Sequence, residues 1–319
     1  MKSPAMRIAF PCRGLATKTL ATWFGKAAPL IDQASILPLF LALTAAAIWG
    51  FNSYIQRMAL DHTDARTGAL LSVAGLAGMF WIFAPFVIDW AWFTDPAIFI
   101  FLGIGLLFPA AGQWLHIAAL PKVGPAITSA LGAFTPLFSV GIGMVLLAEV
   151  VTLQSGFGLT LMILALMLAA WSPKGLVRSF PLWALALPLG ASMARGIAQP
   201  VTKFGLGVIA SPYFAVMIAG SVSTLVLLIL WKTYPGDRRI NARGVRWFLL
   251  SGVLNGLGIL VLNQAMMTGS LTLVSPVAAT TPLFALLFGA VLFRLERLTW
   301  RHLWIGLLSV AGGILILLG

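Results

Sequence analysis

One arginine lies where the sequence is otherwise strongly apolar. Arg195 falls about halfway along the segment 180–208, with no acidic residue nearby to neutralise it. An unpaired guanidinium inside a membrane is penalised by roughly several kcal/mol or more, so it needs a partner. Its planar fork of donors suits a carboxylate or a phosphate, and we expect Arg195 to bind such a group on a substrate. The alternative is hydrogen bonding to carbonyls and amides of neighbouring helices.

The residues after Arg195 add to its surroundings. Gln199 lies one turn further along, and Pro200 cannot donate to the carbonyl of Gly196. We therefore predict an interruption of this helix one turn beyond Arg195, with a free backbone acceptor at mid-depth. Lys203 lies near the end of the segment, where long basic side chains extend to the membrane interface, and we expect that role for it and for Arg57.

Uncharged polar residues supply the other candidates for binding. Asn52 and Gln56 share one face of the segment 36–60, with Trp49 one turn earlier on that face. The remaining members lie on the third and eighth apolar segments and are Gln113, His116, Asn255 and Asn263. We expect these side chains and Gln199 to line a polar cavity, while the alternative is interhelical hydrogen bonding worth about 0.6 kcal/mol each.

The titratable residues exclude several kinds of chemistry. His116 is the only histidine within an apolar segment, so it is the first candidate if transport is proton-linked, and otherwise a hydrogen-bonded structural residue. None of the eight acids lies at mid-membrane, which disfavours proton-coupled export of organic cations. No Walker motif is present, and Cys12 is the only cysteine. We expect no catalytic residue, metal or cofactor, and therefore no enzyme.

The composition explains why these polar residues stand out. Of 319 residues, 60% are hydrophobic and 9% are charged, against roughly 25% charged in soluble domains. The chain has apolar segments long enough to span a membrane. They run approximately over 36–60, 65–88, 96–120, 122–148, 152–171, 180–208, 212–231, 245–268, 271–293 and 299–318. They do not alternate as barrel strands do, so the predicted fold class is an all-α membrane protein with ten transmembrane helices.

An internal repeat divides these ten segments into halves. The tetrapeptide Thr135-Pro136-Leu137-Phe138 recurs 146 residues later as Thr281-Pro282-Leu283-Phe284. The same offset pairs Gly50 with Gly196, Arg57 with Lys203, Gly112 with Gly258, and Gly143 with Gly289, and a slip of one residue pairs Glu149 with Glu296. Because each half has an odd number of spans, the halves must be inverted in the bilayer, which is a common plan of secondary transporters.

The motifs of the two halves carry a family resemblance. In the first half they are Trp49-Gly50-Phe51-Asn52, Ala119-Leu120 and Thr135-Pro136-Leu137-Phe138, followed by Glu149, Thr152 and Gly158. The second half has Thr281-Pro282-Leu283-Phe284, followed by Glu296, Thr299 and Gly306. The chain resembles an EamA-like member of the drug/metabolite transporter superfamily. The resemblance implies ten helices and secondary transport of small organic metabolites, commonly their export. The segment Ala194 to Pro200 departs from the Trp-Gly-x-Asn pattern.

We accordingly expect a basic N-terminal tail over 1–35, a first five-helix repeat over 36–171 and a second over 180–318. The net charge of +12 fits loops that hold a membrane protein in place, so we expect the lipid bilayer and a small molecule as partners, and no nucleic acid. A homodimer is possible. Both termini should share one side of the cytoplasmic (inner) membrane. The loop charges favour an outside location, whereas the basic tail and the resemblance favour the cytoplasm, which we adopt.

The predicted function is alternating-access transport, with export as the direction, of small metabolites such as amino acids or related carboxylates. Two alternatives remain at this level. One is a transporter of phosphate-bearing substrates such as a nucleotide sugar or a lipid-linked carrier, because Arg195 suits phosphate equally well. The other is a membrane protein that transports nothing.

Overall fold

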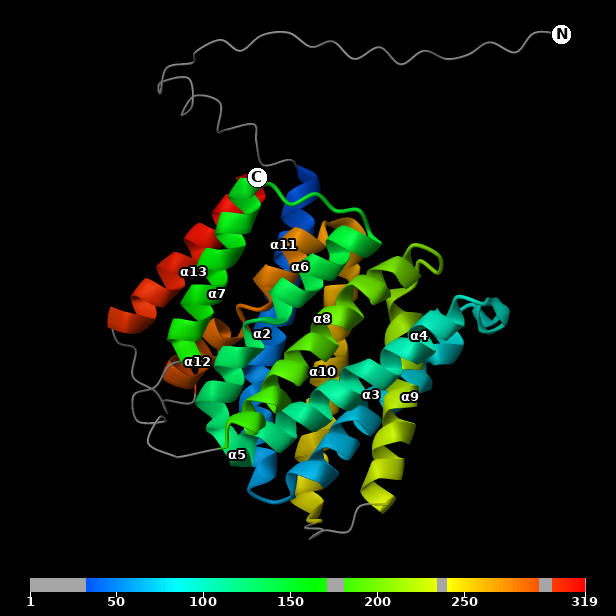
Figure 1. Cartoon of the computed structure of the whole chain (residues 1–319). Helices are drawn as coiled ribbons and strands as arrows, with labels where there is room; N and C mark the ends of the chain where they lie inside the picture. The colour runs from blue at the N-terminus through cyan, green and yellow to red at the C-terminus, as the bar shows by residue number, and fades with distance from the viewer. Residues whose placement is uncertain (1–32, 171–180, 234–239, 293–299, 319) are drawn as a thin grey trace, which may run out of the picture.

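The computed structural model describes residues 33–170, 181–233, 240–292 and 300–318, and these form helices joined by turns, without a strand among them (Figure 1). The helices of the first half are α2 (Gln33–Leu60), α3 (Ala65–Val87), η1 (Trp90–Thr94), α4 (Ile98–Gly105), η2 (Leu106–Ala111), α5 (Gly112–Gly132), α6 (Thr135–Leu146) and α7 (Leu153–Ala170). Those of the second half are η4 (Leu182–Leu185), α8 (Ala186–Leu206), α9 (Pro212–Thr233), α10 (Ala242–Thr268), α11 (Leu271–Ala278), α12 (Thr281–Val291) and α13 (Trp300–Leu318).

The described helices confirm the all-helical membrane architecture but not the exact number of ten spans. Six stretches are long and apolar enough to cross a bilayer, and three shorter apolar helices accompany them. The six are Ile36–Leu60, Ala65–Val87, Ile98–His116, Pro212–Thr233, Ala242–Thr268 and Leu271–Val291. Residues 1–32 of the predicted tail and the ends of several predicted segments lie outside the described residues, and residues 33–35 belong to α2.

Two boundaries differ from the sequence-based prediction. The helix α5 is continuous from Gly112 to Gly132, so it crosses the loop predicted after residue 120. The helix α8 continues through Pro200 to Leu206, so the predicted interruption beyond Arg195 is wrong. A proline removes only one intrahelical bond, and the packing around a buried span is able to hold the helix together across it.

The two halves run in opposite directions. The described beginning of α2 and the end of α13 lie on the same side of the helix layer, which we call the terminal side (Figure 1). The helix α2 leads away from the terminal side, whereas its repeat counterpart α8 leads toward it (Figure 1). This is the antiparallel relation that an odd number of spans in each repeat predicts.

Glycines on α2 and α8 place each helix against the other half. A Cβ added to Gly50 would lie 2.7 Å from Phe284 Cβ on α12, and one added to Gly196 would lie 2.4 Å from Phe138 Cβ on α6. The offset of 146 residues relates both Gly50 to Gly196 and Phe138 to Phe284. The same close approach therefore occurs twice, and each time it joins the two repeats, as small residues do in membrane helix packing.

The third predicted span is broken between α4 and α5. Phe108 has extended backbone angles (φ −147°, ψ 131°), and η2 separates the two helical parts. Ser223 of α9 repairs the break, because its Oγ donates to Gly105 O at 2.6 Å and accepts from Ala110 N at 3.2 Å. Irregular backbone is tolerated within a membrane only where neighbouring groups satisfy it, and this serine does so.

Apolar packing is divided between two clusters of buried residues. One cluster joins α3, α4 and α9 around Phe80, Phe101 and Phe214. The other joins α2, α7, α10, α11 and α13 and includes Met162 and Met266. Because lipid tails are as apolar as these side chains, the packing stabilises the bundle mainly through close van der Waals contact.

The contact between Gly196 and α6 yields a direct test. In Gly196→Ala the new methyl group would meet Phe138 Cβ at 2.4 Å and Thr135 O at 3.0 Å, and the contacted oxygen belongs to the backbone. Alanine gains about 1 kcal/mol of helix propensity over glycine. Overpacking costs about 1 to 3 kcal/mol, so we expect net destabilisation.

Gly141→Ala on α6 is the matched control, because no atom lies within 4 Å of its added methyl group. Thermal unfolding of the two variants in detergent should show a lower midpoint for Gly196→Ala and an unchanged or higher one for Gly141→Ala. Equal midpoints for both variants would show that α8 and α6 are not tightly apposed.

Candidate functional site

Arg195 and His116 meet between the second and first halves. Arg195 Nη2 of α8 lies 3.2 Å from His116 Nδ1 of α5. Arginine has only donors, so His116 Nδ1 must accept this hydrogen bond. The stem of Arg195 lies against Gly112, where an added Cβ would be 3.7 Å from Arg195 Cγ. The structure thus brings together two residues that the sequence analysis proposed separately.

The guanidinium of Arg195 is not fully satisfied. Its Nε is buried and has no hydrogen-bond partner in the described part of the chain. Within the same described ranges, Glu149 pairs with Lys203, and no carboxylate is found in a salt bridge with Arg195. A buried charge without an anionic partner is costly, and a bound anion would remove much of that cost.

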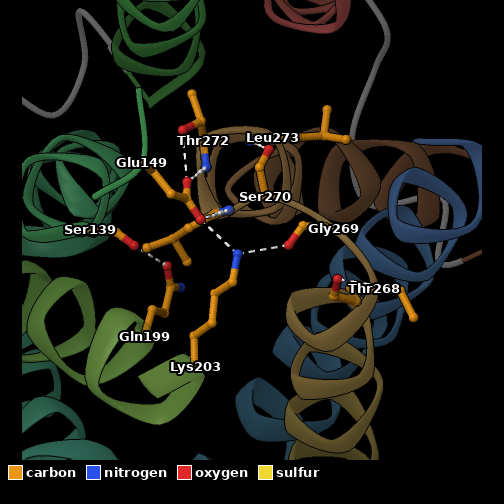
Figure 2. A network of polar contacts seen from close by, with 11 residues as sticks. Ser139, Glu149, Gln199, Lys203, Thr268, Gly269, Ser270, Thr272 and Leu273 are labelled. Carbon is orange, nitrogen blue, oxygen red and sulfur yellow. Dashed lines mark hydrogen bonds and ion pairs between the residues drawn. The ribbon is translucent and has the colours of Figure 1, made fainter. Parts of the chain in front are cut away.

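Gln199 lies one turn from Arg195 and joins three helices. Its Oε1 accepts from Ser139 Oγ of α6 at 2.8 Å and from Ser275 Oγ of α11 at 2.6 Å. Both serines are buried, and Figure 2 shows the bond between Ser139 and Gln199 beneath the charged residues. In this conformation Gln199 binds protein hydroxyls with its carbonyl oxygen, not with the guanidinium of Arg195.

The next turn of α8 takes part in a polar network (Figure 2). Lys203 Nζ donates to Glu149 Oε1 at 2.6 Å and to Gly269 O at 2.8 Å. Glu149 Oε1 also accepts from Leu271 N at 2.8 Å, and its Oε2 accepts from Thr272 N at 3.0 Å and from Thr272 Oγ1 at 2.9 Å. A first-repeat carboxylate therefore lies at the first turn of α11, where backbone donors favour negative charge.

The surroundings of Glu149 favour its ionised form. Burial alone would raise its pKa, but the ammonium of Lys203 and the amides of Leu271 and Thr272 outweigh burial and lower the pKa below the ordinary value of 4.5. The two side chains remain 21% and 15% exposed for Lys203 and Glu149, so water reaches the pair. The structure adds a partner to the sequence-based expectation for Lys203, because its ammonium contacts Glu149, while its position relative to the membrane interface stays a prediction.

The candidates on α2 and α10 form a separate group. Trp49 lies against α10, since a Cβ added to Gly258 would be 2.4 Å from Trp49 Nε1. Asn52 and Asn255 are buried, and Trp49 Nε1, Asn52 Oδ1 and Asn255 Nδ2 find no partner in the described part of the structure. Asn263 is buried on the same α10. The repeat offset relates Trp49 to Arg195 and Gly258 to Gly112, so this group is the counterpart of the Arg195 group.

The remaining predicted residues do not join either group through polar contacts. Gln113 of α5 and Gln56 of α2 are partly buried. The groups of three His, Cys, Asp or Glu side chains that a metal ion requires do not occur among the described residues. The residues that sequence reasoning missed are Glu149, Ser139 and Ser275. The pairing of Glu149 with Glu296 and of Lys203 with Arg57 by the repeat was the available signal for the first of them.

The model of the EamA-like transporter family matches residues 36–171 and again residues 182–318. The chain belongs to the EamA-like transporter family. Each match covers one five-helix half, so the EamA repeat occurs twice, in agreement with the offset of 146 residues.

The EamA family is part of the drug/metabolite transporter superfamily, so the chain is a multi-pass membrane protein of a transporter family and not of an enzyme family. A solved structure described as "Crystal structure of protein" has the same fold, with a TM-score of 0.67 at 13% identity. The alignment covers 88% of this EamA chain and 95% of the other chain. No curated protein matches the sequence.

The lowered pKa of Glu149 predicts an acid dependence of stability. A carboxylate whose pKa is lower in the folded state stabilises that state fully above its unfolded pKa, and this contribution is lost as the pH falls through the folded pKa. We therefore expect the thermal unfolding midpoint to fall below about pH 4.5, and to fall less steeply in Glu149→Gln. Tryptophan fluorescence of the detergent-solubilised protein between pH 7 and pH 3 measures this. Identical pH profiles for the two proteins would contradict it.

Proposed function

We propose that this EamA protein is a secondary transporter that moves small carboxylate-bearing metabolites, such as amino acids, across the cytoplasmic (inner) membrane by alternating access. Export is the proposed direction. Ten spans in two inverted repeats, bounded by residues 36–171 and 180–318, provide the scaffold. The candidate binding residues are Arg195, His116, Gln199, Gln113, Trp49, Asn52, Gln56, Asn255 and Asn263.

The observation that carries this proposal is the unsatisfied guanidinium of Arg195. It lies in the middle of α8, its Nε is buried without a partner, and its polar contact within the described chain is a histidine that carries no negative charge. A guanidinium pairs with a carboxylate through two parallel hydrogen bonds, and Nε is one donor that Arg195 has left for such a pair. A bound carboxylate would therefore supply both the negative charge and the hydrogen-bond acceptors that Arg195 lacks.

The group on α2 and α10 supports a substrate with further polar atoms. Trp49 Nε1 and Asn255 Nδ2 are unused donors, and Asn52 Oδ1 is an unused acceptor. Buried polar groups are normally hydrogen-bonded, so unused groups of both kinds favour a polar occupant. Secondary transporters with inverted repeats bind their substrates between the repeats near the midplane, where the counterpart positions Arg195 and Trp49 lie in their helices.

Substitution of Arg195 tests the proposal. A ligand that binds the folded state raises its unfolding temperature, so a panel of amino acids and other carboxylates is screened against the purified protein. Charge-assisted hydrogen bonds are worth about 1.5 to 3 kcal/mol, so Arg195→Gln should weaken binding of a stabilising carboxylate by about 10- to 100-fold. Uptake into liposomes should fall in parallel.

Arg57→Gln is the matched control, because Arg57 is an exposed arginine on α2 at the position that the repeat relates to Lys203. Its ligand affinity should equal that of the unchanged protein. If Arg195→Gln binds every carboxylate as tightly as the unchanged protein, anion recognition by Arg195 is wrong. If phosphate esters stabilise the protein and carboxylates do not, the substrate class is phosphate-bearing instead.

The proposed membrane orientation has its own test. With cytoplasmic termini, Cys12 in the N-terminal tail should not react with an impermeant thiol reagent in intact cells, and should react after the cells are permeabilised. Because Cys12 is the only cysteine, the labelling is unambiguous. Rapid labelling in intact cells would place the termini outside.

A further inference from the structure

Three polar residues follow one face of α8 from its centre to the terminal side. Arg195, Gln199 and Lys203 are spaced by four residues, so they lie above one another on the helix surface. Arg195 contacts His116, Gln199 holds Ser139 and Ser275, and Lys203 holds Glu149. The contacts of Gln199 and Lys203 join α8 to α6 and α11 on the terminal side of the Arg195 site.

We propose that Glu149 is a releasable latch that closes the terminal side of the substrate pathway in this conformation and must detach from Lys203 and α11 for that side to open. The inference rests on the proposed function, since it concerns access to the site built around Arg195. The carboxylate of Glu149 is the group that would hold the two repeats together on the terminal side.

The contacts of Glu149 show why it acts between repeats. Glu149 belongs to the turn between α6 and α7 of the first repeat. The partners of its carboxylate belong to the second repeat. They are the ammonium of Lys203 on α8 and, at the start of α11, the backbone amides of Leu271 and Thr272 and the hydroxyl of Thr272. Movement of α6 away from α8 and α11 on this side would break these bonds together. The bonds of this single side chain can therefore form only when the two halves are close together on the terminal side.

The same contacts show why the latch is releasable. The ion pair is noncovalent and partly exposed, so water is able to replace each partner when the halves separate. The layer beneath it consists of neutral hydroxyl bonds from Ser139 and Ser275 to Gln199. Ser139 again comes from the first repeat and Gln199 from the second, so both layers divide along the same line between α6 and α8.

The opposite end of the molecule carries the repeat counterpart of this interaction. Arg57 of α2 is the repeat counterpart of Lys203, but its side chain is exposed, and no described carboxylate lies within ion-pair distance of it. The repeat counterpart of Glu149 at that end is Glu296, which lies outside the described residues.

Thiol labelling tests the latch without any substrate. The background carries Cys12→Ser and the reporter Ser275→Cys, whose site is 1% exposed and lies in the layer beneath Glu149. An impermeant thiol reagent is added to the terminal side of sealed membrane vesicles. We expect slow labelling in the background and about tenfold faster labelling after Glu149→Gln, which corresponds to about 1.4 kcal/mol in the opening equilibrium.

Further variants separate the latch from a general loss of structure. Lys203→Gln should also accelerate labelling, but less than Glu149→Gln, because it leaves the bonds of Glu149 to Leu271 and Thr272 in place. The double variant should label no faster than Glu149→Gln alone, because the bond to Lys203 is already lost in that single variant. Thr272→Val removes one of the hydrogen bonds and should give a smaller increase. Asp89→Asn is the matched control, because Asp89 is a carboxylate that caps the backbone of its own turn at Ala91 N, and its labelling should equal the background.

The outcomes are distinct from those of the proposed function. If Glu149→Gln and Lys203→Gln label at the background rate, the latch is wrong whatever Arg195 binds. If Glu149→Gln does not fold, Lys203→Gln and Thr272→Val decide the question. If labelling accelerates as expected while Arg195→Gln leaves carboxylate affinity unchanged, the latch stands and the proposed substrate class fails.

Discussion

The contact between α8 and α6 at Gly196 and Phe138 determines where the polar residues of this protein meet. Absence of a side chain at Gly196 lets the helices of opposite repeats approach closely, and its neighbour Arg195 is thereby fixed between them. One turn further Gln199 reaches Ser139, and beyond it Lys203 reaches Glu149. Three successive interactions between repeats thus depend on one place where two backbones come close.

The two cations on α8, Lys203 and Arg195, differ in how far their charges are compensated by neighbouring groups. Lys203 lies near the helix end, where a carboxylate, a carbonyl and partial exposure to water all compensate its charge. Arg195 lies two turns deeper with one histidine contact and a buried Nε that lacks a partner. Desolvation grows with depth in the membrane, so the deeper charge is the one that an arriving anion would stabilise most.

The sequence predicted the helical class, the repeat and most helix boundaries, because lipid forces every span to be long, apolar and internally hydrogen-bonded. It also singled out Arg195, since a charge within an apolar run is visible without coordinates. It did not predict that α8 continues through Pro200, nor that Lys203 pairs with Glu149. Glu149 is separated from Lys203 by 54 residues, and only the packing of α6 on α8 brings the two together.

The repair of the third span by Ser223 has a mechanical consequence. A continuous helix owes its stiffness to its own hydrogen bonds, but across η2 two of the backbone groups are held by a hydroxyl from α9. The angle between α4 and α5 is therefore set by a neighbouring helix rather than by the span itself. We expect a shift of α9 along its axis to be passed to the third span through these two bonds, and His116 lies on the α5 side of the break, in contact with Arg195.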